Sequence, residues 1–90
     1  MESYNNVFDA VMDTPEEALN MKLRAKLMNE IIDHVNAAGW NQKQAAKYLG
    51  VTQPRISDLL RCKIDLFSLD MLINMLAVMG SEVEITIKTA

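Results

Sequence analysis

Apolar residues recur at helical spacing in the first third of the chain. One stripe lies within residues 14–38 and consists of Leu19, Leu23, Leu27, Met28, Ile31, Ile32 and Val35, a period typical of an amphipathic helix. Thr14 and Glu17 have the spacing of a capping box, and Pro15 stands at the first helical position. Glycine readily adopts the left-handed conformation that ends a helix, so Gly39 is the expected terminator. We therefore predict one long helix that ends at about Ala38.

The middle of the chain has two shorter helical patterns separated by a glycine. Asn41 and Gln44 have the spacing of reciprocal caps at the start of the first pattern, which we expect to end at Gly50. Thr52 is placed to cap the second pattern, where Pro54 is tolerated because it lies in the first turn. These signals predict two helices within residues 41–61. Trp40, directly before the first cap, is expected to staple across its helix onto Ala45 and Ala46.

The last third contains one more helix and then a different period. Ser68 is the expected helix cap, and an apolar stripe precedes Gly80: Met71, Leu72, Met75, Leu76 and Met79. Apolar and polar residues then alternate to Lys88, which predicts a β-strand over residues 81–90. Because the sequence offers no second strand, we expect this strand to pair with that of a second copy and to bury Val83, Ile85 and Ile87 in a homodimer. The alternative is that it folds back on its own helices.

These elements predict an all-α domain of four to five helices with one short C-terminal β-strand. Half of the 90 residues are hydrophobic and few are aromatic, so the core is expected to be aliphatic and rich in methionine. Residues 14–80 form the helical domain, and residues 1–13 form an N-terminal extension without a clear period. The apolar residues of this extension either dock on the domain or a partner, or lie in a tail: Val7, Phe8, Val11 and Met12.

The charge is unevenly distributed along the chain. Overall the net charge is −3, but residues 41–63 hold five basic residues against Asp58 alone, a net charge of +4. The rest of the chain holds four basic residues against eleven carboxylates, a net charge of −7. The positive charge is thus concentrated in the segment of the two short helices, where it can meet a phosphate backbone.

Residues 41–61 have the spacing of a helix-turn-helix. A tight turn at Gly50-Val51 joins the two helices, the small Ala46 stands where they cross, and apolar residues fill the angle between them. The second helix can then enter the major groove of DNA with its N-terminal end inward. Its forked polar side chains suit base edges, whereas helix N-termini and lysines suit phosphates. We expect the following DNA-binding residues: Gln42, Lys43, Lys47, Thr52, Gln53, Pro54, Arg55, Ser57, Asp58 and Arg61.

The motifs of nearly the whole chain resemble one family. Asn-Val-Phe at residues 6–8, Val-Thr-Gln-Pro-Arg-Ile-Ser at 51–57, Phe-Ser-Leu at 67–69 and Val-Glu-Ile at 83–85 are similar to those of Xre/Cro-type helix-turn-helix regulators. The chain resembles in particular the branch of HigA-like antitoxins of type II toxin–antitoxin modules. This resemblance implies a fold of the lambda-repressor/Cro-like type.

The resemblance also implies a function and places residues in it. A protein of this type represses its own operon by binding an inverted-repeat operator as a homodimer, and an antitoxin in addition neutralises a RelE/HigB-like RNase toxin. Gln42 matches the phosphate-contacting glutamine of the family, and Gln53, Pro54, Arg55 and Asp58 fall at or beside its operator-contacting positions. Cys62 departs from the pattern, because the usual sequence at residues 61–63 is Arg-Gly-Lys. A cysteine there is strained if the left-handed conformation is retained.

Other functions have less support from the sequence. No second His or Cys stands at ligand spacing from His34, so we expect a solvated histidine and no metal or cofactor. We find no nucleophile–base constellation and no phosphate-binding loop, so we do not expect an enzyme. The sequence has no membrane span and a single cysteine, which favours a cytoplasmic protein. Two alternatives to an antitoxin remain: a repressor without a toxin partner, and a protein-interaction module with a vestigial helix-turn-helix.

Overall fold

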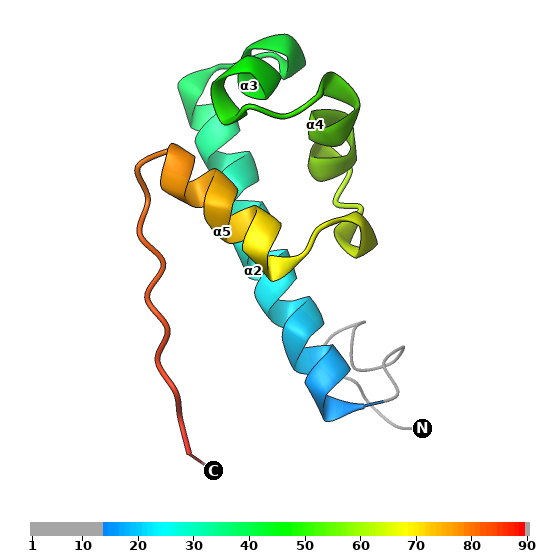
Figure 1. Cartoon of the computed structure of the whole chain (residues 1–90), viewed down its shortest axis with the longest axis vertical. Coiled ribbons are helices and arrows are strands. Elements are labelled where there is room, and N and C mark those ends of the chain that lie inside the picture. Colours follow the sequence, from blue (N-terminus) through cyan, green and yellow to red (C-terminus); the bar gives the residue numbers. More distant parts are fainter. Residues whose placement is uncertain (1–13, 90) are drawn as a thin grey trace.

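The computed structural model describes residues 14–89, which form four α-helices and one short 3₁₀ helix. In chain order these are α2 (Pro15–Ala38), α3 (Gln42–Leu49), α4 (Gln53–Leu60), η1 (Ile64–Leu66) and α5 (Leu69–Val78). Helices α3, α4 and α5 gather around the C-terminal half of α2, whereas its N-terminal half projects away from them (Figure 1). The all-helical fold predicted from the sequence is confirmed. The predicted N-terminal extension, with its Asn-Val-Phe element, lies outside the described residues.

Side chains at the predicted positions cap all four α-helices. The Oγ1 of Thr14 accepts a hydrogen bond from the amide of Glu17, and the Oγ of Ser68 accepts one from the amide of Met71. Asn41 and Gln44 form a complete capping box, with bonds of 2.8 and 2.9 Å. Each cap satisfies an amide that would otherwise lack a partner in the first turn. The helix starts could be predicted because these interactions lie within one turn of sequence.

A single apolar core joins all four α-helices. Its largest side chains with almost no exposure are Met28, Ile31, Val35, Ile56, Leu59, Phe67 and Leu72. The predicted stripe of α2 therefore faces the core, but only in part. Leu19 is 59% exposed and Leu23 is 41% exposed, so the N-terminal part of the stripe does not lie in the core. Among the described residues, α3, α4 and α5 pack on the C-terminal half of α2, while its N-terminal half projects beyond them (Figure 1).

Trp40 packs at the corner between α2 and α3. Its ring lies 4.4 Å from the ring of Tyr48 and 6.0 Å from that of His34, and the side chain also contacts the core. Trp40 therefore contributes to packing in this corner, as the sequence indicated. His34 is half-buried beside Trp40, rather than fully solvated as expected.

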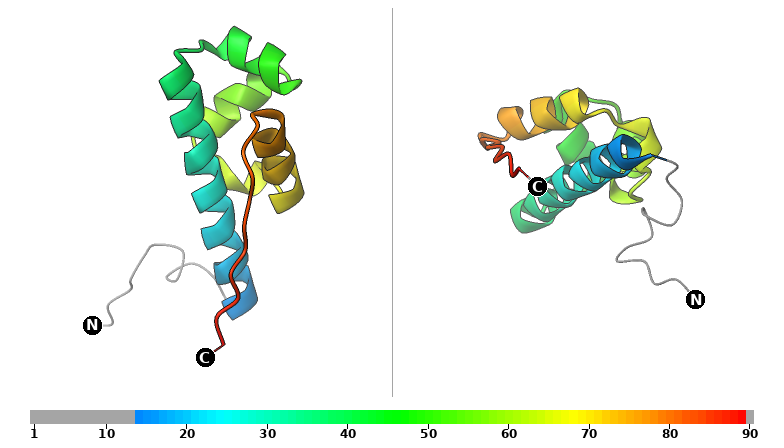
Figure 2. Two further views of the ribbon diagram at one scale, coloured as in Figure 1. Left: turned by 90° about the vertical axis from the view of Figure 1, so that its left-hand side faces the viewer. Right: turned by 90° about the horizontal axis from the view of Figure 1, so that it is seen from below.

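The predicted C-terminal β-strand is not formed in the structure. Residues 81–89 form an extended tail that runs in the direction opposite to α2 and lies apart from the N-terminal half of that helix (Figures 1 and 2). Within residues 14–89, the tail beyond Ser81 makes no backbone hydrogen bond, so no strand ladder exists. The alternating pattern is present, but a strand also requires a neighbouring strand, and residues 14–89 of one copy do not supply one. Val83 packs against the core, whereas Ile85 and Ile87 are 72% and 83% exposed.

No helix of residues 14–89 is both long enough and apolar enough to cross a bilayer.

Cys62 holds a backbone conformation that suits glycine. Its φ is 56°, the only positive φ among the non-glycine residues described. Its amide donates to the carbonyl of Leu59 and its carbonyl accepts from the amide of Ile64, so both backbone groups hold the turn after α4. The left-handed conformation brings the Cβ atom close to backbone oxygen and costs about 1 kcal/mol or more. The strain expected from a cysteine at this position is therefore present.

Replacing Cys62 by glycine should stabilise the protein. The substitution Cys62→Gly removes the strained Cβ, and we expect the free energy of unfolding in urea to rise by about 0.5–1 kcal/mol. Gly39→Ala is the matched reverse control. Gly39 has a φ of 71° and open space where a Cβ would lie, so alanine there should cost about 1 kcal/mol through backbone strain without a clash. An unchanged or lower stability of Cys62→Gly would contradict this account.

Candidate nucleic-acid interface

Helices α3 and α4 form a compact helix-turn-helix. The amide of Val51 donates to the carbonyl of Ala46 at 3.0 Å, and Gly50 has a φ of 70°, so the chain reverses direction within one tight turn. The Oγ1 of Thr52 then accepts from the amide of Arg55 and starts α4. The inner faces of the pair are buried in the core: Ala45, Ala46, Leu49, Ile56 and Leu59. With these faces sealed, the polar faces of both helices must point outward.

Most of the predicted DNA-binding residues are exposed. On α3 these are Gln42, Lys43 and Lys47, and around the start of α4 they are Thr52, Gln53 and Pro54. Arg61, directly after α4, is also exposed, and its side chain makes no hydrogen bond or ion pair with residues 14–89. The start of α4 thus presents polar side chains to solvent, where they can reach base edges and phosphates.

Two predicted residues at the middle of α4 are less accessible. Ser57 and Asp58 are half-buried. The carboxylate of Asp58 lies 3.7 Å from the ammonium of Lys63, and the carbonyl of Asp58 accepts from the amide of Lys63. Asp58 therefore helps to close the turn after α4, besides any role at the surface.

Arg55 is held within the protein. Its Nη1 donates to the carbonyl of Leu66 at 3.1 Å, and its guanidinium lies 5.4 Å from the centre of the Phe67 ring. A guanidinium in this position stacks on an aromatic face and satisfies a loop carbonyl at the same time. The interpretation of Arg55 as a free base-reading side chain is therefore too simple, because part of its bonding capacity fixes α4 against η1.

Arg24 fixes the same loop from the other side. It lies on α2, and its Nη1 donates to the carbonyls of Ile64 at 3.0 Å and Phe67 at 3.3 Å, while its Nε donates to the side chain of Asn20. Sequence reasoning missed this residue. The contact spans about forty residues of chain and joins a side chain to backbone carbonyls, so no local pattern announces it.

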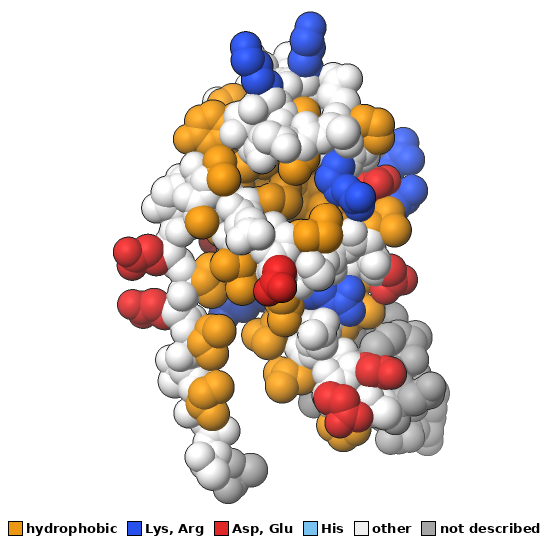
Figure 3. Space-filling view, in the orientation of Figure 1, with side chains coloured by type: hydrophobic (Ala, Val, Ile, Leu, Met, Phe, Trp, Pro, Cys, Tyr) orange, Lys and Arg blue, Asp and Glu red, His pale blue; other side chains and the backbone are white. Residues whose placement is uncertain are grey.

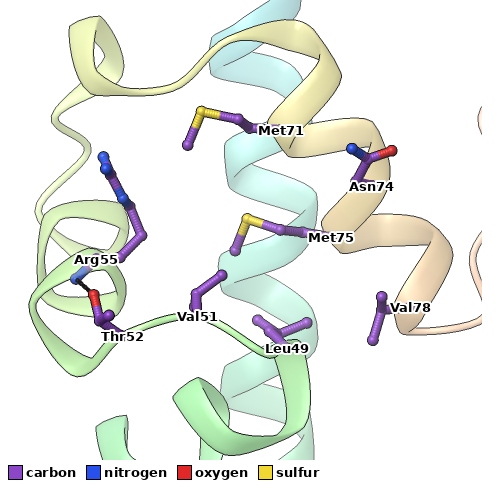
Figure 4. A pocket seen from close by; sticks show the side chains of 8 residues that line it. All are labelled: Leu49, Val51, Thr52, Arg55, Met71, Asn74, Met75 and Val78. Carbon is purple, nitrogen blue, oxygen red and sulfur yellow. Dashed lines mark hydrogen bonds between the residues drawn. The ribbon is translucent and has the colours of Figure 1, made fainter.

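A groove separates α4 from α5. It has a volume of about 410 Å³ and is lined by side chains of the α3–α4 unit and of α5 (Figure 4): Leu49, Val51, Thr52, Arg55, Met71, Asn74, Met75 and Val78. Since this space is open, α4 is not packed tightly against α5 along this side. Its position depends on the buried contacts of Ile56 and Leu59 and on the Arg55 contact with the loop.

Basic side chains are concentrated at one end of the face seen in Figure 3. Most lysines and arginines on this face project from the end of the molecule that carries α3 and α4, with a few lower down, and carboxylates lie along the tail, on the N-terminal half of α2 and at the centre of the face (Figure 3). The concentration of positive charge inferred from the sequence is thus also seen in the structure. Among residues 14–89 no group of three or more His, Cys, Asp or Glu side chains is arranged to hold a metal ion.

Comparisons with known proteins agree with this geometry. The chain belongs to a family described as a helix-turn-helix domain, which matches residues 8–88. A solved structure described as belonging to the XRE family of transcriptional regulators is similar to it, with a TM-score of 0.73 and 28% sequence identity over 79% of this chain and 80% of that chain. No curated protein sequence matched the chain.

Arg55 and Arg61 should differ in their effect on stability. Arg55→Ala removes a charged hydrogen bond and a cation–π contact from a half-buried site, so we expect the free energy of unfolding to fall by about 1 kcal/mol. Arg61→Ala is the control, because it makes the same change at an exposed position and should stay within about 0.5 kcal/mol of wild type. Urea unfolding measures both. Equal stabilities for the two variants would contradict the structural role of Arg55.

Proposed function

We propose that this protein is a sequence-specific DNA-binding transcriptional regulator. The observation that carries the proposal is the exposed polar start of α4, beside the lysines of α3, on a helix-turn-helix whose inner apolar side chains are buried in the core. A helix presented in this way fits the major groove, whereas a vestigial motif would not need to keep polar side chains and basic charge together on the surface.

The residues of this surface divide by chemistry into two groups. Gln53 and Arg61 are free to make paired hydrogen bonds to base edges, glutamine with adenine and arginine with guanine. Gln42, Lys43, Lys47 and Thr52 lie at helix starts or on the flank, where they are suited to phosphate oxygens. Pro54 offers only an apolar contact, such as with a thymine methyl group. Arg55 fixes α4 against η1 through its hydrogen bond to Leu66, and only its remaining N–H groups can donate to DNA.

The proposed regulator acts as a homodimer on an inverted repeat. One helix-turn-helix covers a few base pairs, and a two-fold pair would place two copies of α4 in successive major grooves about 34 Å apart. The resemblance to regulators that repress their own operon makes its own promoter the proposed operator. Binding should weaken steeply as salt rises, because phosphate contacts release counterions.

Removing a base contact should have a different effect from removing a phosphate contact. Duplexes selected from a random library serve as the probe, with fluorescence anisotropy as the measurement. Arg61→Ala should lower affinity by about 1–3 kcal/mol and relax the preference at one base pair. Lys43→Ala should lower the affinity for all duplexes alike. It should also reduce the slope of log affinity against log salt concentration by about one, because one counterion fewer is released.

Lys26→Ala is the matched control for charge. Lys26 is exposed on α2 and is not one of the proposed DNA-binding residues, so this variant changes the net charge as Lys43→Ala does. It should bind like wild type. If no duplex is bound at low ionic strength, or if all three variants bind equally, the proposed surface is wrong.

We further propose that the regulator is an antitoxin with a RelE/HigB-like RNase as its partner. Outside residues 41–63 the chain has a net charge of −7, and Glu16 and Glu17 stand exposed at the start of α2. An RNase that binds a polyanion carries a basic surface, which acidic residues can cover. The motif resemblance to HigA-like antitoxins supports the same assignment.

The antitoxin proposal predicts a neighbour in the genome and a complex in solution. An adjacent reading frame should encode a small basic protein that co-purifies with this chain and whose toxicity this chain relieves. The double variant Glu16→Lys/Glu17→Lys should weaken that complex and leave DNA binding intact, because these residues lie far from α4. A regulator that binds its operator but has no such neighbour is instead a repressor without a toxin.

A further inference from the structure

The C-terminal tail has backbone hydrogen-bonding groups that lack partners within residues 14–89. These groups lie beyond Ser81, although the sequence there alternates as in a strand. Val83 anchors the tail to the core, and Ile85 and Ile87 then stand 72% and 83% exposed. Exposed apolar side chains on an unpaired strand-like segment favour pairing with another strand.

The tail also faces a second uncovered apolar surface. In the space-filling view an open gap lies between the tail and the N-terminal half of α2, and apolar side chains of the tail lie along its inner edge (Figure 3). Leu19 and Leu23, on that half of α2, are 59% and 41% exposed. A second strand beside the tail would widen the apolar face that can pack toward these leucines.

The sequence of the tail is self-complementary in one register. We propose that two copies of this chain pair their tails antiparallel about a two-fold axis at Ile85, which defines the interface of the proposed regulator dimer. Val83 then faces Ile87 of the other copy on the apolar side. Glu82 faces Lys88 of the other copy on the polar side, so the axis generates two ion pairs. Cross-strand pairs of both kinds stabilise an antiparallel ladder.

Neighbouring registers that keep the apolar faces together satisfy fewer groups. An axis at Glu84 places the two Glu84 carboxylates directly opposite each other, and like charges in that position are destabilising. An axis at Thr86 opposes Glu84 and Lys88 but leaves Val83 opposite the polar Thr89. A shift by a single paired residue turns the apolar set toward the polar set. Only the axis at Ile85 pairs all three apolar residues with one another.

Disulfide trapping distinguishes these registers. The test uses the full chain in the Cys62→Gly background, with single cysteines at Glu84→Cys, Ile85→Cys or Thr86→Cys. A residue on the axis faces its own copy at about 5 Å, within reach of a disulfide. A residue one position away lies about 8 Å from its own copy, given a rise of about 3.4 Å and a strand spacing of about 4.8 Å, which is too far. Only Ile85→Cys should form a covalent dimer on mild oxidation.

Charge reversal provides an independent measurement on the same register. Glu82→Lys or Lys88→Glu alone should weaken dimerisation by roughly three- to thirtyfold in sedimentation, because each change creates two like-charge pairs. The double variant Glu82→Lys/Lys88→Glu should restore wild-type dimerisation. Glu84→Lys is the matched control at an exposed position that faces Thr86 and should have the smaller effect.

Each outcome decides the matter. Cross-linking through Glu84→Cys or Thr86→Cys in place of Ile85→Cys overturns this register, and a dimer that none of the three cysteines traps overturns the tail as the interface. A monomeric wild-type chain also overturns it. The inference rests on the proposed regulator dimer, but these experiments contain no DNA. Binding of a half-site by a monomer would therefore leave the DNA-binding proposal standing while the interface fails.

Discussion

The arrangement of this protein depends on one apolar core that the α3–α4 pair shares with the C-terminal half of α2 and with α5. Ile31 and Val35 of α2 meet Ile56 and Leu59 of α4 in one core with almost no exposed apolar surface. This contact consumes the apolar faces of both short helices, which are too short to be stable on their own. Their polar faces are consequently directed to solvent together, and the proposed DNA-binding surface is a by-product of the same packing that makes the helices fold.

The loop after α4 adds a second constraint on the same helix. Arg24 and Arg55 reach the loop from α2 and α4, and between them they bind the carbonyls of Ile64, Leu66 and Phe67. The groove between α4 and α5 leaves α4 without close packing against α5. The hydrogen bonds of the two arginines to the loop are therefore important for the orientation of α4. The strained Cys62 lies in the same turn. Arg55, which the sequence suggested as a base-reading side chain, thus also holds the loop after α4, and in the proposed function Gln53 and Arg61 carry more of the base recognition.

The sequence predicted features that depend on neighbours within one or two turns. The caps at Thr14, Asn41, Thr52 and Ser68 were each predictable, because a side-chain oxygen and an amide three residues later are joined whatever the rest of the chain does. The exposure of Leu19, the absence of a C-terminal strand and the hydrogen bond of Arg55 to the loop could not be predicted in this way. Each of these depends on which distant segment lies alongside, or on whether any segment does.

The sequence by itself determined where the four α-helices begin, approximately where they end, most of the residues on their core sides, and that residues 41–61 make a helix-turn-helix, because periodicity and capping are local. Only the tertiary structure decided that the packing covers half of α2, that two arginines hold the loop after α4, and that the tail has no strand partner among residues 14–89. Those features arise from contacts between residues tens of positions apart, whose geometry is fixed only when the whole core closes.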